Sequence, residues 1–238
     1  MVASGKGVNH QMCVFLRLLH LMRRVTVVVF ALFVVLGFAG GFSTMLHAET
    51  QSPLRVMVLG DSLVAGHGLN HGDAFPDALQ VALDAAGYEV EMFNAGVSGD
   101  TTAGGLARLD WSLAEEPDAM IIVLGGNDLL RGLDPAATYE NLAAIINRLR
   151  DRNITVLLAG MQAPRNLGRD YADEFDAVYR RLGAREDVLF YPFFLDGVAL
   201  VPAFNQADGM HPNKEGVAEI TRRILPIVET LMQRTLNR

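Results

Sequence analysis

The sequence predicts an α/β fold: a three-layer α/β/α sandwich with helices on both faces of a five-stranded parallel sheet. Five short apolar runs recur along the chain, several of them rich in Val and Ile, as expected for strands buried on both faces. Helical patterns lie between them, and this alternation implies right-handed crossovers. Half of the 238 residues are hydrophobic and 20% are charged, which suffices for a sizeable core and excludes disorder as the main state.

The five predicted strands are each six or seven residues long. In chain order they are Arg55–Gly60, Val90–Ala95, Ala119–Gly125, Ile154–Gly160 and Val188–Phe193.

Helix start and stop signals divide the rest of the chain. Asp73–Ala86 ends at a glycine, Thr101–Ala114 follows Asp100 as a possible cap, and Asp134 followed by Pro135 starts the next helix. Asp170–Leu182 is the fourth predicted helix, and Lys214–Leu236 closes the chain with an expected kink at Pro226.

The N-terminus predicts export. Residues 1–24 carry four basic residues and no acidic one, the apolar run Val25–Phe42 follows, and the small Ala48 comes shortly after it. This order is typical of a signal peptide, so residues 1–48 are expected to be removed, leaving residues 49–238 as a single exported domain in the periplasm. An uncleaved anchor through residues 25–42 remains the alternative, and both Met1 and Met22 are possible starts. Either way the remainder is exported.

Composition excludes several classes of function. The net charge of −7 argues against a nucleic-acid partner. A single cysteine cannot form an internal disulfide or a thiolate zinc site. No metal is expected at His67 and His71, because no third ligand of obvious spacing accompanies them.

Polar residues cluster where the predicted strands end, which is where sites gather in open α/β sheets. Ser62 follows the first strand in Gly-Asp-Ser-Leu, and Val64 departs from the Gly-x-Ser-x-Gly elbow of α/β-hydrolases. Gly99 follows the second strand and Asn127 the third. Each alone would be read as an ordinary cap or turn residue.

The last loop carries Asp208 and His211 in Asp-Gly-Met-His-Pro. A serine nucleophile needs a base, and the base needs an orienting carboxylate. Three residues of separation allow a compact turn to bring this carboxylate and imidazole together. An isolated Asp-x-x-His is a weak signal, which also fits a surface turn.

Taken together and in this order, the four motifs resemble those of the SGNH, or GDSL, hydrolase family. The blocks are Gly60–Leu63, the loop around Gly99, the loop around Asn127, and Asp208–Pro212. The resemblance covers residues 55 to about 235 and is strongest to the periplasmic bacterial branch of esterases, thioesterases and lysophospholipases. It implies a flavodoxin-like order of strands.

The resemblance also implies a mechanism without metal or cofactor. Ser62 would attack an acyl carbonyl, with His211 as base and Asp208 as its orienting partner. The backbone N–H groups of Ser62 and Gly99 and the Asn127 side chain would form the oxyanion hole. The implied substrates are small-molecule acyl esters or thioesters, membrane lipids among them.

Apolar residues beyond the motifs predict an acyl groove. Leu129 and Leu130 follow Asn127, and Met161 and Pro164 follow the fourth strand. Anchoring of loops against the core explains them equally well. A carbohydrate O-acetyl esterase on the same fold is the alternative function, although the single tryptophan, Trp111, offers no sugar platform. The sequence leaves the oligomeric state open.

Overall fold

The computed structural model describes residues 52–238, so the predicted signal peptide, the alternative anchor and both candidate start residues lie outside the described part. Within it, five parallel strands form one sheet in the order β2-β1-β3-β4-β5. The strands are β1 (Leu54–Gly60), β2 (Val90–Gly96), β3 (Ala119–Val123), β4 (Thr155–Ala159) and β5 (Val188–Tyr191). The predicted five-stranded parallel sheet is therefore confirmed.

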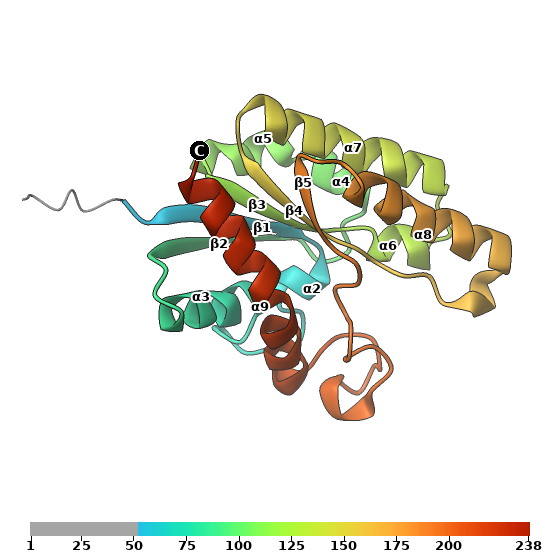
Figure 1. The fold of residues 1–238 in the computed structure, drawn as a ribbon. Helices are drawn as coiled ribbons and strands as arrows, with labels where there is room; N and C mark the ends of the chain where they lie inside the picture. Colours follow the sequence, from blue (N-terminus) through green and yellow to red (C-terminus); the bar gives the residue numbers. More distant parts are fainter. Residues whose placement is uncertain (1–51) are drawn as a thin grey trace, which may run out of the picture. The chain divides into compact units, whose positions relative to one another are not determined.

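Helices cover both faces of the sheet, which confirms the three layers (Figure 1). One layer holds α3 (Phe75–Ala85) and α9 (Lys214–Leu236); the other holds α4 (Thr102–Ala107), α5 (Leu109–Ser112), α7 (Pro135–Asp151) and α8 (Arg169–Gly183). The shorter pieces are α2 (Ser62–Ala65), α6 (Gly126–Leu130), η1 (Leu113–Glu115), η2 (Arg165–Leu167) and η3 (Pro202–Phe204).

The apolar runs of the sequence form the buried strands at the centre of the core. β3 and β4 are buried along their whole length, and β1 is buried from Val56 onward. The edge strand β2 is only half-buried, because one side of it has no neighbouring strand. The buried faces of α3, α7, α8 and α9 complete the core with Phe75, Leu79, Ile145, Leu149, Phe175, Leu182, Ile224 and Leu231.

The prediction of one helix over Thr101–Ala114 was wrong. The helix is interrupted at Arg108, which has φ −99° and ψ 4°, and resumes as α5 and η1. Gly104 and Gly105 weaken the first segment. Asp100 is also not the cap: the Thr101 hydroxyl accepts from the Gly104 N–H at 3.2 Å, and the Asp100 carboxylate instead accepts from Arg108.

Two other helix signals read from the sequence concern α7 and α9. Asp134 caps α7 by accepting from the Ala136 N–H at 2.8 Å, with Pro135 in the first turn, as predicted. The last helix runs as one element over Lys214–Leu236 with Pro226 inside it, and the kink expected at Pro226 stays a prediction. The short α2 and α6, which the sequence analysis left within loops, lie at the carboxyl ends of β1 and β3.

The register of β1, β2 and β3 places the ends of these strands, and so the starts of the loops that follow them, at the same edge of the sheet. Gly60 at the end of β1 pairs with Gly96 of β2 and with Val123 of β3. A Cβ on Gly96 would lie 2.3 Å from the backbone N of Ala65, so glycine lets α2 fold back closely over β2. The loops that carry Ser62, Gly99 and Asn127 therefore all start at the same edge of the sheet.

Candidate active site

The candidate site lies at the carboxyl edge of the sheet, where the strand order reverses. The chain leaves β1 toward β2 on one side, while β3 lies on the other side. Such a switch point opens a crevice in doubly wound sheets. Ser62 is the first residue of α2, and the preceding Asp61 caps that helix by accepting from the Leu63 N–H at 3.0 Å.

Ser62, His211 and Asp208 form a continuous chain of hydrogen bonds. His211 Nε2 lies 2.9 Å from Ser62 Oγ, and His211 Nδ1 lies 2.6 Å from Asp208 Oδ2. Ser62 and His211 are 149 positions apart in the sequence. The loop that follows β5 carries Asp208 and His211 back to the first strand, so the structure brings together the three residues that the motifs singled out.

The Asp208 carboxylate is held in its charged form. The hydrogen bond from the His211 side chain, followed by the backbone N–H groups of His211 and Met210, holds the pKa of Asp208 well below its ordinary value. These backbone groups donate to Asp208 Oδ1 at 3.0 and 2.9 Å. Because a carboxylate only accepts hydrogen bonds, Nδ1 must carry the imidazole proton and Nε2 is left to accept from the Ser62 hydroxyl.

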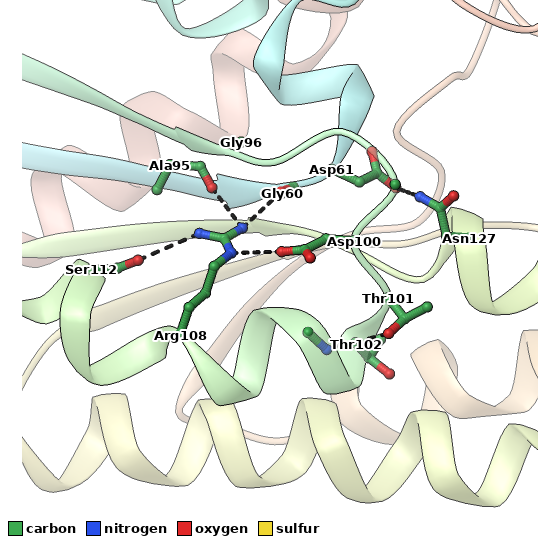
Figure 2. Close-up of polar contacts among 12 residues, drawn as sticks. Gly60, Asp61, Ala95, Gly96, Asp100, Thr101, Thr102, Arg108, Ser112 and Asn127 are labelled. Carbon is green, nitrogen blue, oxygen red and sulfur yellow. Dashed lines mark hydrogen bonds and ion pairs between the residues drawn. The ribbon is translucent and has the colours of Figure 1, made fainter.

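Gly99 follows β2 and Asn127 follows β3, the two strands that flank β1. Asn127 is the second residue of α6, and its Nδ2 donates to Asp61 Oδ2 at 3.1 Å (Figure 2). Gly99 has a φ of +85°, a left-handed conformation that glycine adopts without strain. Its loop is joined to the serine turn by the Val97 N–H, which donates to the Gly60 carbonyl at 3.0 Å.

The sequence analysis assigned no role to Asp61, whose side chain contacts two parts of the candidate site. Its side chain is 1% exposed, and burial raises its pKa to about 6 although the Leu63 N–H and Asn127 lower it. One carboxyl group thus caps the helix of Ser62 and orients the Asn127 amide. Its place between Gly60 and Ser62 was a signal, but the partner 66 positions away was not readable from the sequence.

His67 is a second unforeseen neighbour. It lies in the turn after α2, with its ring centroid 4.6 Å from that of His211 and the ring planes tilted by 45°. Gln206 supports this turn by donating to the His67 carbonyl at 2.7 Å. The exposed His67 ring therefore shields one side of the His211 ring.

The four residues predicted to line an acyl groove divide into two pairs. Leu129 and Met161 are buried in the core at 9% and 4% exposure, so they have little surface to offer to a ligand. Leu130, which is 61% exposed, and Pro164 are accessible. The sequence analysis did not name Val97 and Met210, which are exposed apolar residues beside Gly99 and His211.

Residues 52–238 show neither a metal-binding cluster nor a membrane-spanning helix. This part of the chain has no group of three or more His, Cys, Asp or Glu side chains arranged to hold a metal ion. Across the same residues, the helices lack the combined length and apolarity that a membrane span requires.

Comparison with known proteins identifies the family. Residues 58–218 match the family described as GDSL-like Lipase/Acylhydrolase. The chain belongs to this family. It is accordingly an acyl ester hydrolase with the SGNH fold, as its sequence motifs predicted.

Named relatives agree with this assignment. The chain is 38% identical to Esterase TesA of Pseudomonas aeruginosa over 82% of this chain and 97% of that protein. It is also 38% identical to Thioesterase 1/protease 1/lysophospholipase L1 of Escherichia coli K12, over 73% of this chain and 83% of that one. The crystal structure of TesA superposes with a TM-score of 0.71 at 42% identity, covering 74% of this chain and 99% of that chain.

Proposed function

We propose that the protein hydrolyses carboxylic esters and thioesters through an acyl-enzyme on Ser62. The observation that carries the proposal is the hydrogen-bonded series Ser62–His211–Asp208 at the carboxyl edge of the sheet. A hydroxyl within hydrogen-bonding reach of a base that is itself oriented by a carboxylate is the arrangement that activates a serine.

In the proposed mechanism, the Ser62 hydroxyl transfers its proton to His211 Nε2 as Oγ attacks the acyl carbonyl. Asp208 stabilises the imidazolium that forms. The backbone N–H groups of Ser62 and Gly99 and the Asn127 amide stabilise the oxyanion. His211 then protonates the leaving alcohol or thiol, and water, with His211 again as base, releases the acid and restores Ser62.

Asn127 donates to Asp61 in the free enzyme, and the second N–H of its amide remains for the oxyanion. A carboxylate beside this amide orients it before substrate arrives. Such prior orientation lowers the reorganisation that the transition state requires.

The proposed substrates are small acyl esters and lipid-type esters, with thioesters as a further class. The names of the relatives, esterase and thioesterase/lysophospholipase, support this range. Exposed apolar residues beside the site, Val97, Leu130 and Met210, suit an acyl chain. We place the enzyme in the periplasm, with residues 1–48 as a cleaved signal peptide and an anchor through residues 25–42 as the alternative.

The test is hydrolysis of p-nitrophenyl esters from acetate to palmitate by the purified protein beside Ser62→Ala. We expect Ser62-dependent turnover that rises from acetate to longer chains. Turnover confined to acetate would favour a carbohydrate O-acetyl esterase. Wild-type turnover by Ser62→Ala would refute the acyl-enzyme on Ser62.

A further inference from the structure

The guanidinium of Arg108 lies against the ends of the two strands that carry the Ser62 and Gly99 loops (Figure 2). Its Nη2 donates to the Gly60 carbonyl at 3.0 Å and to the Ala95 carbonyl at 2.9 Å. Its Nε donates to Asp100 Oδ2 at 2.6 Å. Both side chains of this ion pair are 18% exposed, so water screens it less than it screens a surface pair.

These contacts are made to residues that neighbour the proposed nucleophile and oxyanion donor in the sequence. Gly60 comes two positions before Ser62, and Asp100 directly follows Gly99. The Gly60 carbonyl also accepts from the Val97 N–H of the Gly99 loop. A single planar guanidinium thus links the turn of Ser62 to the loop of Gly99, which its five N–H donors in a fixed fork allow.

A second arginine contacts the same loop at the neighbouring residue, Gly99. Arg131 Nη2 donates to the Gly99 carbonyl at 2.8 Å, and the Asp100 N–H donates to the Val97 carbonyl at 3.0 Å. Gly99 has a left-handed φ of +85°, and as a glycine it has no side chain to restrict its backbone. Its orientation therefore depends on the contacts of its neighbours.

We propose that Arg108 is a positioning residue that fixes the Gly99 loop against the Ser62 turn through Asp100, and so sets the alignment of two oxyanion donors. The inference rests on the proposed function of Ser62 and Gly99. Arg108 touches neither substrate nor reacting atoms; it acts through the loop. A purely structural ion pair would change the stability of the fold but not the rate per folded site.

The test compares Arg108→Met, Arg108→Lys and Asp100→Asn in the full-length protein on p-nitrophenyl butyrate. Active sites are counted by titration with a fluorophosphonate, and binding of an alkyl trifluoromethyl ketone, which forms a tetrahedral oxyanion with an active serine, is measured alongside. Because loss of one oxyanion donor costs about a hundredfold or more, misalignment in Arg108→Met should lower kcat per site roughly 10- to 100-fold, with KM changed by less than about threefold. Affinity for the ketone should fall in parallel with kcat/KM.

Three further variants test whether the effect depends on the geometry of the Arg108–Asp100 pair. Arg108→Lys should recover only part of kcat, because one ammonium cannot reproduce the planar fork to Asp100 and both carbonyls. Asp100→Asn should shift kcat in the same direction by less, and it serves if Arg108→Met does not fold. Arg148→Met is the matched control, since Arg148 pairs with Asp110 on the exposed surface and should leave kcat and ketone affinity unchanged.

Two outcomes would overturn the inference: kcat per titrated site equal to wild type in Arg108→Met and Asp100→Asn, or reduced kcat with unchanged ketone affinity. If the wild-type protein itself showed no Ser62-dependent turnover and no labelling by the fluorophosphonate, the proposed function would fail instead.

Discussion

At the scale of single residues, the buried Asp61 accepts two hydrogen bonds, and its burial makes the charged carboxylate less favourable. It accepts from the Leu63 N–H, which starts α2, and from Asn127, which it orients beside Ser62. Burial dominates its electrostatics and raises its pKa to about 6. The ionised form that accepts both hydrogen bonds is therefore less stable in the fold than it would be in water.

This predicts a pH dependence of stability. A carboxyl group whose pKa is higher in the folded state than its ordinary 3.8 stabilises the fold while protonated, and that contribution is lost as pH rises through about 6. The difference corresponds to about 3 kcal/mol. The unfolding free energy of wild type relative to Asp61→Asn should fall between pH 4 and pH 7, as measured by urea denaturation.

The Asp61→Asn variant serves as the reference because it removes this titration and leaves the other carboxylates in place. A difference between the two proteins that stays flat from pH 4 to pH 7 would contradict the raised pKa. The same variant should lower kcat, because Leu63 and Asn127 donate to different oxygens of Asp61, and in Asn an NH2 group that cannot accept replaces one of those oxygens.

The residues proposed to react were singled out from the sequence, whereas the residues that contact and support them were not. Ser62, Gly99 and Asn127 each follow a predicted strand, and parallel strands end at one edge of a sheet. Asp61 and Arg108 act through partners 66 and 48 positions away. No local pattern reports such contacts, because a capping Asp and a helical Arg look the same whether they face solvent or a strand end.

At the scale of elements, the start of α6 decides where Asn127 lies. Gly125 caps this helix with φ +112°, and a Cβ there would lie 1.9 Å from Tyr179 Oη. Tyr179 cannot move easily, since it is 1% exposed and donates to the Leu124 carbonyl at 2.8 Å. Burial also raises the pKa of Tyr179 well above its ordinary value, so it remains a donor.

Gly125→Ala should therefore destabilise the fold by about 3 kcal/mol or more, from backbone strain together with overpacking. It should also lower kcat by displacing Asn127. Gly132→Ala is the matched control: its φ is +60°, but no atom lies within 4 Å of the added Cβ, so only the left-handed backbone costs about 1 kcal/mol. Equal losses in urea unfolding would show that the contact with Tyr179 is unimportant.

Strand boundaries followed from apolar runs, but the break at Arg108 did not. The sequence pattern predicts one helix from Thr101 to Ala114. The helix is interrupted at Arg108, the residue whose guanidinium donates to Asp100 and to the two strand-end carbonyls. The sequence analysis also could not tell which of the four predicted groove residues are buried and which are exposed. Hydrophobicity alone does not tell buried Leu129 from exposed Leu130.

At the scale of the whole molecule, the strand order 2-1-3-4-5 places the site at the reversal between β1 and β3. The loop after β5 then returns His211 to β1. All site contacts described above fall within residues 52–238, and β1 begins at Leu54. The alternating pattern predicted the layers, and the family resemblance added the order of the strands.

A chain of residues 49–238 should consequently fold cooperatively and hydrolyse p-nitrophenyl butyrate with the kcat of the full-length protein. Its net charge is −11, because the four basic residues of the leader are removed, which favours solubility. Circular dichroism during thermal unfolding and steady-state kinetics check this. An unfolded or inactive 49–238 would show that residues 1–48 contribute to the domain.

The most direct test of the account is to trap the acyl group itself. The protein is mixed with p-nitrophenyl butyrate, quenched in acid within the first turnovers, digested and analysed by mass spectrometry. The account predicts a butyryl group on the peptide that contains Ser62, and none in Ser62→Ala. Turnover with no acylated peptide, or acylation of another residue in place of Ser62, would contradict it.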